Sequence, residues 1–313
     1  MNIMTLKQLE AFYWAASCAN FAMAAERVHL SISSLSKRIV ELEDSLGHPL
    51  FDRSGHRATL TDAGHRLLPQ AAQLLESAAK IQASLSQKIG LSGRCVFGVG
   101  ELSALTWLPE FVSASREQFP DLKLEPYVDI GAVLEERMDR GELDFAVIAG
   151  RSSRQNILSH PLTEARFVWV ASSELVGNAQ MMTSALLKRL PLITLPHGAG
   201  TTRILDDWLL GQGINSVERI VCNHWGAIAG LLLEGIGVGF LPEELARTLS
   251  KRSKLKVLQS RLLLAPLAYS YQWRRHDARP LIGLMRELVV QTASFSSVGQ
   301  LFGPRESNNR RKK

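Results

Sequence analysis

The sequence predicts an α/β protein whose first ninety residues are mostly helical. Two observations support this prediction. Apolar residues recur at helical spacing from Leu6 to Leu85, and from Arg94 onward short strand-like runs alternate with helical runs. The chain has 313 residues, of which 46% are hydrophobic and 21% are charged. This length and composition allow roughly two globular domains with ample core.

The stretch Phe21–Leu46 predicts two helices joined by a tight bend. The first covers 22–29 and is rich in alanine, and Ser31 is expected to cap the second by accepting a backbone N–H. From Leu35 an apolar stripe follows the helical period, which leaves on the opposite face Ile32, Ser33, Ser36 and Lys37. Small hydroxyls and one lysine suit a helix that lies in a DNA major groove. The alternative is the solvated face of an ordinary amphipathic helix.

The flanking segments favour the first interpretation. Thr5 and Gln8 fit a capping box ahead of a helix over 4–16. Gly47 is expected to end the second helix of the pair. The segment 50–60 then predicts two short extended arms around a turn, with three basic or titratable residues near the tip: Arg53, His56 and Arg57. A hairpin of this kind beside a recognition helix is placed to touch phosphates or the minor groove.

These segments resemble, without a gap over residues 5–64, the winged helix-turn-helix of the LysR-type transcriptional regulators. The matching runs are LKQLEAFYWAA, NFAMAAERVHLSISSLSKRIVELEDSLGHPLFDR and LTDAG, with the helix-turn-helix from Phe21 to Val40. The resemblance implies DNA contacts from Ile32, Ser33, Ser36, Lys37, Arg53, His56 and Arg57. The family usually has glutamine where Ile32 stands and often a basic residue where Met23 stands. Ile32 would pack on a thymine methyl instead of bonding to a base edge.

A long helix is predicted over 65–89, with an apolar stripe that includes Leu67, Leu74, Ile81 and Leu85. A helix of this length spans about 35 Å, and its stripe needs a partner. The resemblance implies that it packs antiparallel against the same helix of a second subunit. The alternative is a helix that packs on its own chain. Residues 91–93 are expected to form a short hinge.

From Arg94 the alternation predicts parallel α/β sheet in two lobes. The first lobe is expected to have strands over 96–99, 122–128 and 144–148 and helices over 108–119 and 133–140. After a loop, a second series covers 167–249, and a strand over 268–273 and a helix over 281–292 return to the first lobe. Two lobes joined in this way resemble the periplasmic-binding-protein-like effector domain of the same family. GELDFAV at 141–147 and EGIGVGFLPEELA at 234–246 fit it well.

The expected division of the chain follows. Residues 4–64 form the winged helix-turn-helix DNA-binding domain, 65–90 the linker and dimerisation helix, and 93–302 the effector-binding domain. Within the last, lobe I is 93–165 with 267–302, and lobe II is 166–266. Residues 303–313 are expected to be a disordered basic tail that carries +4 of the formal net charge of +6. Overall charge therefore says little about DNA binding, and the local placement of basic residues says more.

The effector is expected in the cleft between the lobes, where strands end and helices begin. The residues expected there are Glu101, Ser103, Gly131, His197, Thr201, Thr202, Asn223 and His224. Glu101 brings a negative charge and favours a ligand with a donor group over a bare dicarboxylate. The alternative for each serine and threonine is that it only caps a helix.

Other classes of protein are disfavoured. No catalytic residues are nominated, the eight histidines include no pair at metal-ligand spacing, and no cofactor is implied. Gly235, Gly237 and Gly239 follow a helix and enter a strand, the reverse of a phosphate-binding loop, and predict a helix stop and close packing. A transport binding protein would share the two-lobed fold but would not carry residues 5–64. No signal peptide or sufficiently long apolar run is found, and three scattered cysteines suit a reduced cytoplasm.

The sequence thus predicts a cytoplasmic regulator that binds double-stranded promoter DNA as a homodimer or homotetramer. It is expected to respond to a small polar effector, without a membrane partner, and RNA polymerase is a further candidate partner. The alternative within this class is a regulator of the same fold that responds to no ligand.

Overall fold

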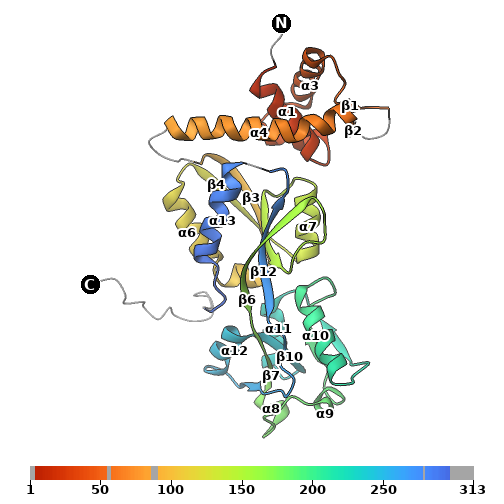
Figure 1. Cartoon of the computed structure of the whole chain (residues 1–313). Coiled ribbons are helices and arrows are strands. Elements are labelled where there is room, and N and C mark those ends of the chain that lie inside the picture. Colours follow the sequence, from red (N-terminus) through yellow and green to blue (C-terminus); the bar gives the residue numbers. More distant parts are fainter. Residues whose placement is uncertain (1–3, 55–57, 86–90, 278, 297–313) are drawn as a thin grey trace, which may run out of the picture.

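The computed structural model describes residues 4–54, 58–85, 91–277 and 279–296. It shows a helical N-terminal domain followed by two α/β lobes, arranged one after the other (Figure 1). Two long strands, β6 (Ile157–Ala165) and β12 (Leu267–Arg274), run toward the junction between the lobes (Figure 1). The part nearest the N-terminal domain is called lobe I, and the other is called lobe II.

The N-terminal domain contains helices α1 (Leu6–Ser17), α2 (Phe21–Arg27) and α3 (Ile32–Leu46). The predicted capping box is confirmed, because Thr5 N donates to Gln8 Oε1 at 2.8 Å and Gln8 N donates to Thr5 Oγ1 at 3.3 Å. The predicted cap of α3 is also confirmed, with Ser34 N donating to Ser31 Oγ at 3.1 Å. The apolar stripe of α3 is fully buried at Leu35, Ile39 and Leu42. The predicted starts of α1 and α3 and the predicted buried face of α3 are therefore all present in the structure.

The predicted hairpin forms two short strands. Strand β1 (Phe51–Asp52) pairs antiparallel with β2 (Thr59–Leu60). The residues 55–57 between them lie outside the described part of the chain, and they include the predicted contacts His56 and Arg57. Thr61 Oγ1 donates to Pro49 O at 2.7 Å, which joins the two ends of the hairpin.

Helix α4 (Asp62–Leu85) divides its apolar stripe between two environments. In its N-terminal half Ala71 is buried, and Leu67 and Leu75 pack against the core of the N-terminal domain. Farther along, Leu74 is 44% exposed and Ile81 is also exposed. Leu67, which the sequence predicts in the contact with a second subunit, thus also packs on the core of its own domain.

The sheet of lobe I has the strand order β4-β3-β5-β12-β6. Its other strands are β3 (Gly93–Val99), β4 (Leu122–Val128) and β5 (Phe145–Ala149). These three are parallel, but β12 runs antiparallel to both β5 and β6. The predicted parallel arrangement of the first three strands is thus confirmed, and β12 is antiparallel because it returns from lobe II and enters the sheet from the opposite end. The sequence predicts a loop in place of β6, since ILSHPLTEA has no apolar run.

Helices cover both faces of this sheet. Helices α6 (Leu108–Gln118) and α13 (Pro280–Thr292) lie together on one face, and α7 (Gly131–Asp139) lies on the other (Figure 1). Phe111 of α6 and Met285 of α13 belong to the main core. Leu134 and Met138 of α7 form a separate small core with Ile148. A short helix that the sequence did not predict, α5 (Glu101–Leu105), follows β3.

Lobe II has a second mixed sheet, ordered β11-β7-β10-β8-β9. Its strands are β7 (Phe167–Ser172), β8 (Leu192–Thr194), β9 (Arg219–Val221), β10 (Val238–Pro242) and β11 (Leu255–Leu258). Its helices are α8 (Ser173–Val176), α9 (Ser184–Leu187), α10 (Gly200–Gly211), α11 (Trp225–Leu233) and α12 (Glu243–Ser250). Strands β8, β9 and β10 are parallel as predicted, whereas β7 is antiparallel to β10 and β11.

The glycines after α11 serve the packing that the sequence predicts. Gly235 has a φ of 70° and follows the end of α11. A Cβ at Gly237 would lie 2.3 Å from Pro191 O, closer than any side chain tolerates. The prediction of a helix stop and close backbone approach is confirmed. Within the described residues, none of the helices combines the length and apolar character that a membrane span requires.

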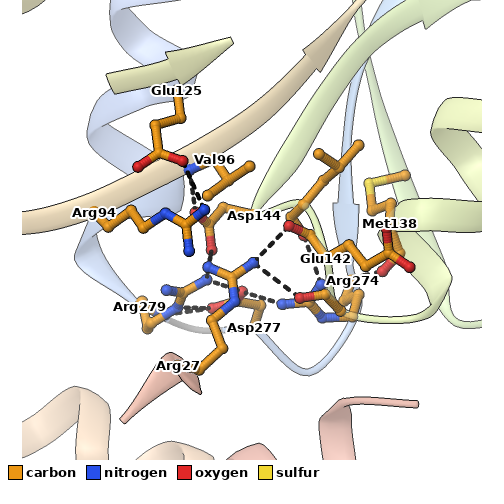
Figure 2. Close-up of polar contacts among 12 residues, drawn as sticks. Arg27, Arg94, Val96, Glu125, Met138, Glu142, Asp144, Arg274, Asp277 and Arg279 are labelled. Atoms are coloured by element: carbon orange, nitrogen blue, oxygen red, sulfur yellow. Dashed lines mark hydrogen bonds and ion pairs between the residues drawn. The ribbon is translucent and has the colours of Figure 1, made fainter. Parts of the chain in front are cut away.

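The N-terminal domain docks on lobe I through Arg27, at the end of α2. Arg27 Nη1 lies 2.9 Å from Asp144 Oδ1, and Nη2 donates to Gly141 O at 2.8 Å and to Glu142 O at 2.9 Å (Figure 2). The side chains of Arg27 and Asp144 are only 11% and 0% exposed. This contact is therefore a buried ion pair with further hydrogen bonds, the arrangement that limits the cost of burying charge.

Asp144 is shared by three groups at this junction. Arg279 Nη2 lies 2.8 Å from the same Oδ1, and Val96 N donates to Oδ2 at 2.7 Å. Burial alone would raise the pKa of Asp144, but the charges of Arg279 and Arg27 outweigh burial and hold the pKa below its usual range. A carboxyl whose pKa is lowered by folding stabilises the fold above its unfolded pKa, about 3.9. This contribution is lost as the pH falls through the lowered pKa.

Aromatic residues of α1 complete the junction. The guanidinium carbons of Arg27 and Arg279 lie 5.3 and 4.6 Å from the ring centroid of Trp14, within the range of cation–π attraction. Tyr13 OH donates to His276 O at 3.3 Å. Residues of α1 and α2 thus contact the segments that lead to Asp144 and to Arg279.

We predict that Arg27→Met releases this docking. Methionine keeps an apolar stem but removes the charge and three hydrogen bonds, so the free energy of unfolding should fall by about 1–3 kcal/mol. Chemical denaturation of the full-length protein measures the change. Arg94→Gln is the matched control, because Arg94 bridges Glu26 and Glu125 in pairs that are largely exposed and weak, about 1 kcal/mol or less. Equal effects of the two substitutions would contradict the prediction.

Candidate functional site

Most of the outward face of α3 is exposed. Ile32 is 52% exposed, Ser33 and Lys37 are exposed, and Ser36 is half-buried. The hydroxyls of Ser31 and Ser33 lie 2.9 Å apart at the start of the helix. The opposite face is the buried stripe that begins at Leu35, so the helix presents a narrow face of small and basic side chains to solvent.

The hairpin of β1 and β2, which is the wing of this domain, is joined to α3 by Glu43, a residue that sequence reasoning missed. Glu43 Oε1 accepts Leu50 N at 2.7 Å and Phe51 N at 3.1 Å. Its other oxygen lies 3.6 Å from Arg53 Nη2, and Arg53 remains partly exposed. Glu43 therefore fixes β1 against the end of the recognition helix. One of several acidic residues on a helix carries no signal of this role, because most such residues are simply solvated.

A cavity of about 650 Å³ lies between the two lobes. On the lobe I side it is bounded by the ends of β3, β4 and β5 and by the starts of α5 and α7. On the lobe II side it is bounded by the starts of α10 and α11. Its volume is in the range of small-molecule sites, and its position at strand ends is the usual one in α/β proteins.

Five of the eight predicted effector residues line this cavity: Glu101, Gly131, Thr201, Asn223 and His224. They come from both lobes, so the structure brings together residues that lie far apart in the sequence. These residues lie in or directly before the first turns of α5, α7, α10 and α11.

The structure does not bring the other three to the cavity. Ser103 is fully buried within the short helix α5 and does not line the cavity. Thr202 Oγ1 donates to Pro196 O at 2.9 Å, a contact with the loop before α10. His197 is exposed and is not part of the cavity lining. The alternative of a capping residue is wrong for Thr202, because its hydroxyl donates to a carbonyl and does not accept a backbone N–H at the start of α10.

Two acidic residues of the lining were not predicted. Asp129 follows β4, and its Oδ1 accepts Ile130 N at 2.8 Å ahead of α7. Glu135 is in the second turn of α7 and also lines the cavity. The position of Asp129 directly after a strand was the available signal, whereas Glu135 resembles any charged residue on an amphipathic helix.

Glu101 joins the two lobes across the cavity. Trp225 N, at the start of α11, donates to Glu101 Oε1 at 2.9 Å and Oε2 at 2.8 Å. His224 Nδ1 lies 3.1 Å from Oε1. Burial raises the pKa of Glu101, against the lowering effects of the Trp225 N–H and of His224. A carboxylate of lobe I thus already occupies the start of a lobe II helix, the kind of position that favours an anion.

The geometry defines a winged helix-turn-helix domain attached to a two-lobed α/β domain with a cavity between its lobes. Comparison with known protein families agrees with this description. Residues 6–65 match the family described as "Bacterial regulatory helix-turn-helix protein, lysR family". Residues 88–294 match the one described as "LysR substrate binding domain". The chain therefore belongs to the LysR family of transcriptional regulators, with a helix-turn-helix domain and an effector-binding domain.

Individual relatives are distant but extend over most of the chain. The transcriptional activator IlvY of Salmonella typhimurium is 27% identical over 246 residues, 77% of this chain and 83% of the relative. The uncharacterized regulator YwqM of Bacillus subtilis has the same identity and coverage. Among solved structures, ArgP from Mycobacterium tuberculosis has a TM-score of 0.64 at 24% identity, covering 94% of this chain and 98% of ArgP. A full-length OxyR variant from Pseudomonas aeruginosa has a TM-score of 0.63 at 23% identity, covering 94% of this chain and 97% of OxyR. These two structures share the fold of this chain.

We predict that Lys37 contacts DNA from α3. Lys37→Ala should weaken binding to a specific site by about 1–3 kcal/mol if the lysine bonds to a base edge. Gel-shift titration with a native binding site measures the loss. Lys123→Ala, which removes an exposed lysine from β4 in lobe I, is the charge-matched control. Unchanged affinity of Lys37→Ala would show that this face of α3 does not enter the groove.

Proposed function

We propose that this protein binds promoter DNA as a dimer or tetramer and that a small polar effector in the cavity regulates this binding. The observation that carries the proposal is the exposed face of α3 with Ile32, Ser33 and Lys37 above a fully buried stripe. Such a face can approach base edges without loss of core packing. DNA binding, not catalysis, is its proposed role, and RNA polymerase is the proposed partner on the promoter.

The cavity supports a role for an effector. It lies between two lobes that contribute Thr201, Asn223 and His224 from one side and Glu101 and Gly131 from the other. A molecule that contacts both sides stabilises one relative position of the lobes over others, which is the requirement for a ligand to shift a conformational equilibrium. Lobe I in turn contacts the N-terminal domain through Asp144.

The exposed part of α4 supports self-association. Leu74 is 44% exposed on a helix whose N-terminal half packs Leu67, Ala71 and Leu75 on the N-terminal domain. An apolar side chain at this position gains from burial against a second copy of the same helix. Two copies joined in this way would present two α3 helices to one DNA duplex, the arrangement used by dimeric helix-turn-helix proteins.

Sequencing of the DNA fragments that the protein binds from the genome of its source tests the proposed function. We expect enrichment of fragments upstream of genes, with a repeated half-site that reflects a two-fold symmetric dimer. The same experiment with Lys37→Ala should lose this enrichment. Binding without any preferred sequence in the wild-type protein would contradict a role as a promoter-specific regulator.

We predict that Leu74→Asp reduces the number of subunits. The substitution would bury an unpaired carboxylate in the contact between α4 helices, which is strongly unfavourable. Light scattering should show a smaller particle, while circular dichroism shows a folded chain. Leu210→Asp is the control, because Leu210 is 74% exposed on α10 in lobe II. A Leu74→Asp protein with wild-type mass would exclude Leu74 from the main contact between subunits.

A further inference from the structure

The charged side chains that line the cavity are mostly acidic. Among the described residues of the lining, Glu101, Asp129 and Glu135 carry carboxylates, and neither lysine nor arginine is present. His224 is the remaining titratable group among them apart from a tyrosine, and it lies against Glu101. The electrostatic potential inside the cavity is therefore set by carboxylates, which attract a positive group.

Two carboxylates of the cavity lining already accept backbone N–H groups at or next to the start of a helix. Both oxygens of Glu101 accept Trp225 N at the start of α11. Asp129 Oδ1 accepts Ile130 N immediately before α7. A ligand carboxylate at either place would meet a carboxylate at close range, and like charges repel. The cavity thus disfavours an anion at two of its polar corners.

Asp129 and Glu135 retain the capacity to hold a cation. The second oxygen of Asp129 lies 3.4 Å from Tyr127 OH, a long contact. Glu135 Oε2 lies 4.0 Å from Arg154 Nε, and Arg154 Nη1 is held more tightly by Asp139 at 2.6 Å. Each carboxylate offers further lone pairs for N–H donors. Both residues belong to the segment that leads into and through the first turns of α7, so they face the cavity from the same lobe.

The opposite wall supplies a different kind of group. Thr201, in the first turn of α10, lines the cavity and is only 3% exposed. Its hydroxyl has no hydrogen-bond partner among the described residues, although a buried polar atom normally has one. The residue before α10, Ala199, provides no side-chain cap. A polar group of a ligand on this side would therefore meet an unsatisfied hydroxyl and the free N–H groups of a helix start.

We propose that the cavity takes a small molecule with a positively charged nitrogen, an ammonium or guanidinium group, held by Asp129 and Glu135, with a polar acceptor toward Thr201. This inference rests on the effector role proposed above and specifies the chemical class of the effector. The carboxylates supply the attraction for the nitrogen, and the start of α10 supplies donors for the other end. The apolar residues Ile148 and Leu195 also line the cavity.

A ligand screen on the full-length protein tests the class. The cationic probes are L-arginine, L-lysine, agmatine and putrescine, and the comparison compounds are glutarate, citrate and glucose. Thermal shift is measured first, because a ligand that binds only the folded state raises the melting temperature. Isothermal titration calorimetry then gives the affinity. We expect at least one cationic probe to bind and the dicarboxylates and the sugar to have no effect.

Variants of the two carboxylates locate the binding. Glu135→Gln and Asp129→Asn should each weaken the cationic probe about 10- to 100-fold, the effect of a lost charge-assisted hydrogen bond. Glu136→Gln is the matched control, because Glu136 is the adjacent residue of α7 and pairs with Arg140 on the exposed side. Circular dichroism checks that each variant is folded, and Glu135→Gln serves alone if Asp129→Asn unfolds the start of α7.

Three outcomes would overturn the inference. These are binding of glutarate or citrate in preference to the cations, equal affinity of the cationic probe for all three variants, and no thermal shift from any cationic probe at millimolar concentration. DNA binding is measured separately by gel shift on the same protein. A protein that binds its DNA site but prefers an anionic compound keeps the proposed regulatory function and loses only the proposed ligand class.

Discussion

The buried carboxylate of Asp144 joins the N-terminal domain to lobe I. Its Oδ1 accepts from Arg27 of α2 and from Arg279 before α13, and its Oδ2 accepts Val96 N of β3. A carboxylate without exposure is tolerated only while such partners remain, because removal of one partner leaves charge that water cannot reach. The orientation of the recognition helix α3 relative to lobe I therefore depends on this group of side chains (Figure 2).

Strands β3 and β5 both connect this junction with the cavity. Strands β3 and β5 are parallel and neighbouring, with Phe97 paired to Phe145. Their first residues lie at the junction, near Val96 and Asp144, and their ends lead to Gly100 and Ala149 in the cavity lining. At about 3.3 Å per residue, roughly 13–17 Å of strand separates the two places. A shift of these strands in the plane of the sheet would thus move both the residues that line the cavity and the residues that hold the N-terminal domain.

The sequence predicts those parts of the structure that depend on local signals. Ser31 caps α3 because the hydroxyl and the N–H it accepts are three residues apart, and the family resemblance rests on the same contiguous stretch. The mixed sheets and the burial of Ser103 escape such reasoning, since strand direction depends on how the chain returns from lobe II. The pairing of Arg27 with Asp144 joins residues 117 positions apart and has no local pattern at all. Five of the eight predicted effector residues do line the cavity, because the ends of strands and the starts of helices can be located along the sequence.

The central claim, that Arg27 and Asp144 fix the DNA-binding domain on lobe I, is tested most directly by a distance measurement within one subunit. Spin labels on unnatural amino acids at Glu41 of α3 and Glu117 of α6, both exposed, report the separation of the two domains. Labelled protein is mixed with excess unlabelled protein so that distances between subunits do not contribute. A single narrow distance distribution in the wild type, broadened in Arg27→Met, is the predicted result. A broad distribution in the wild type, or an unchanged one in Arg27→Met, would contradict the claim.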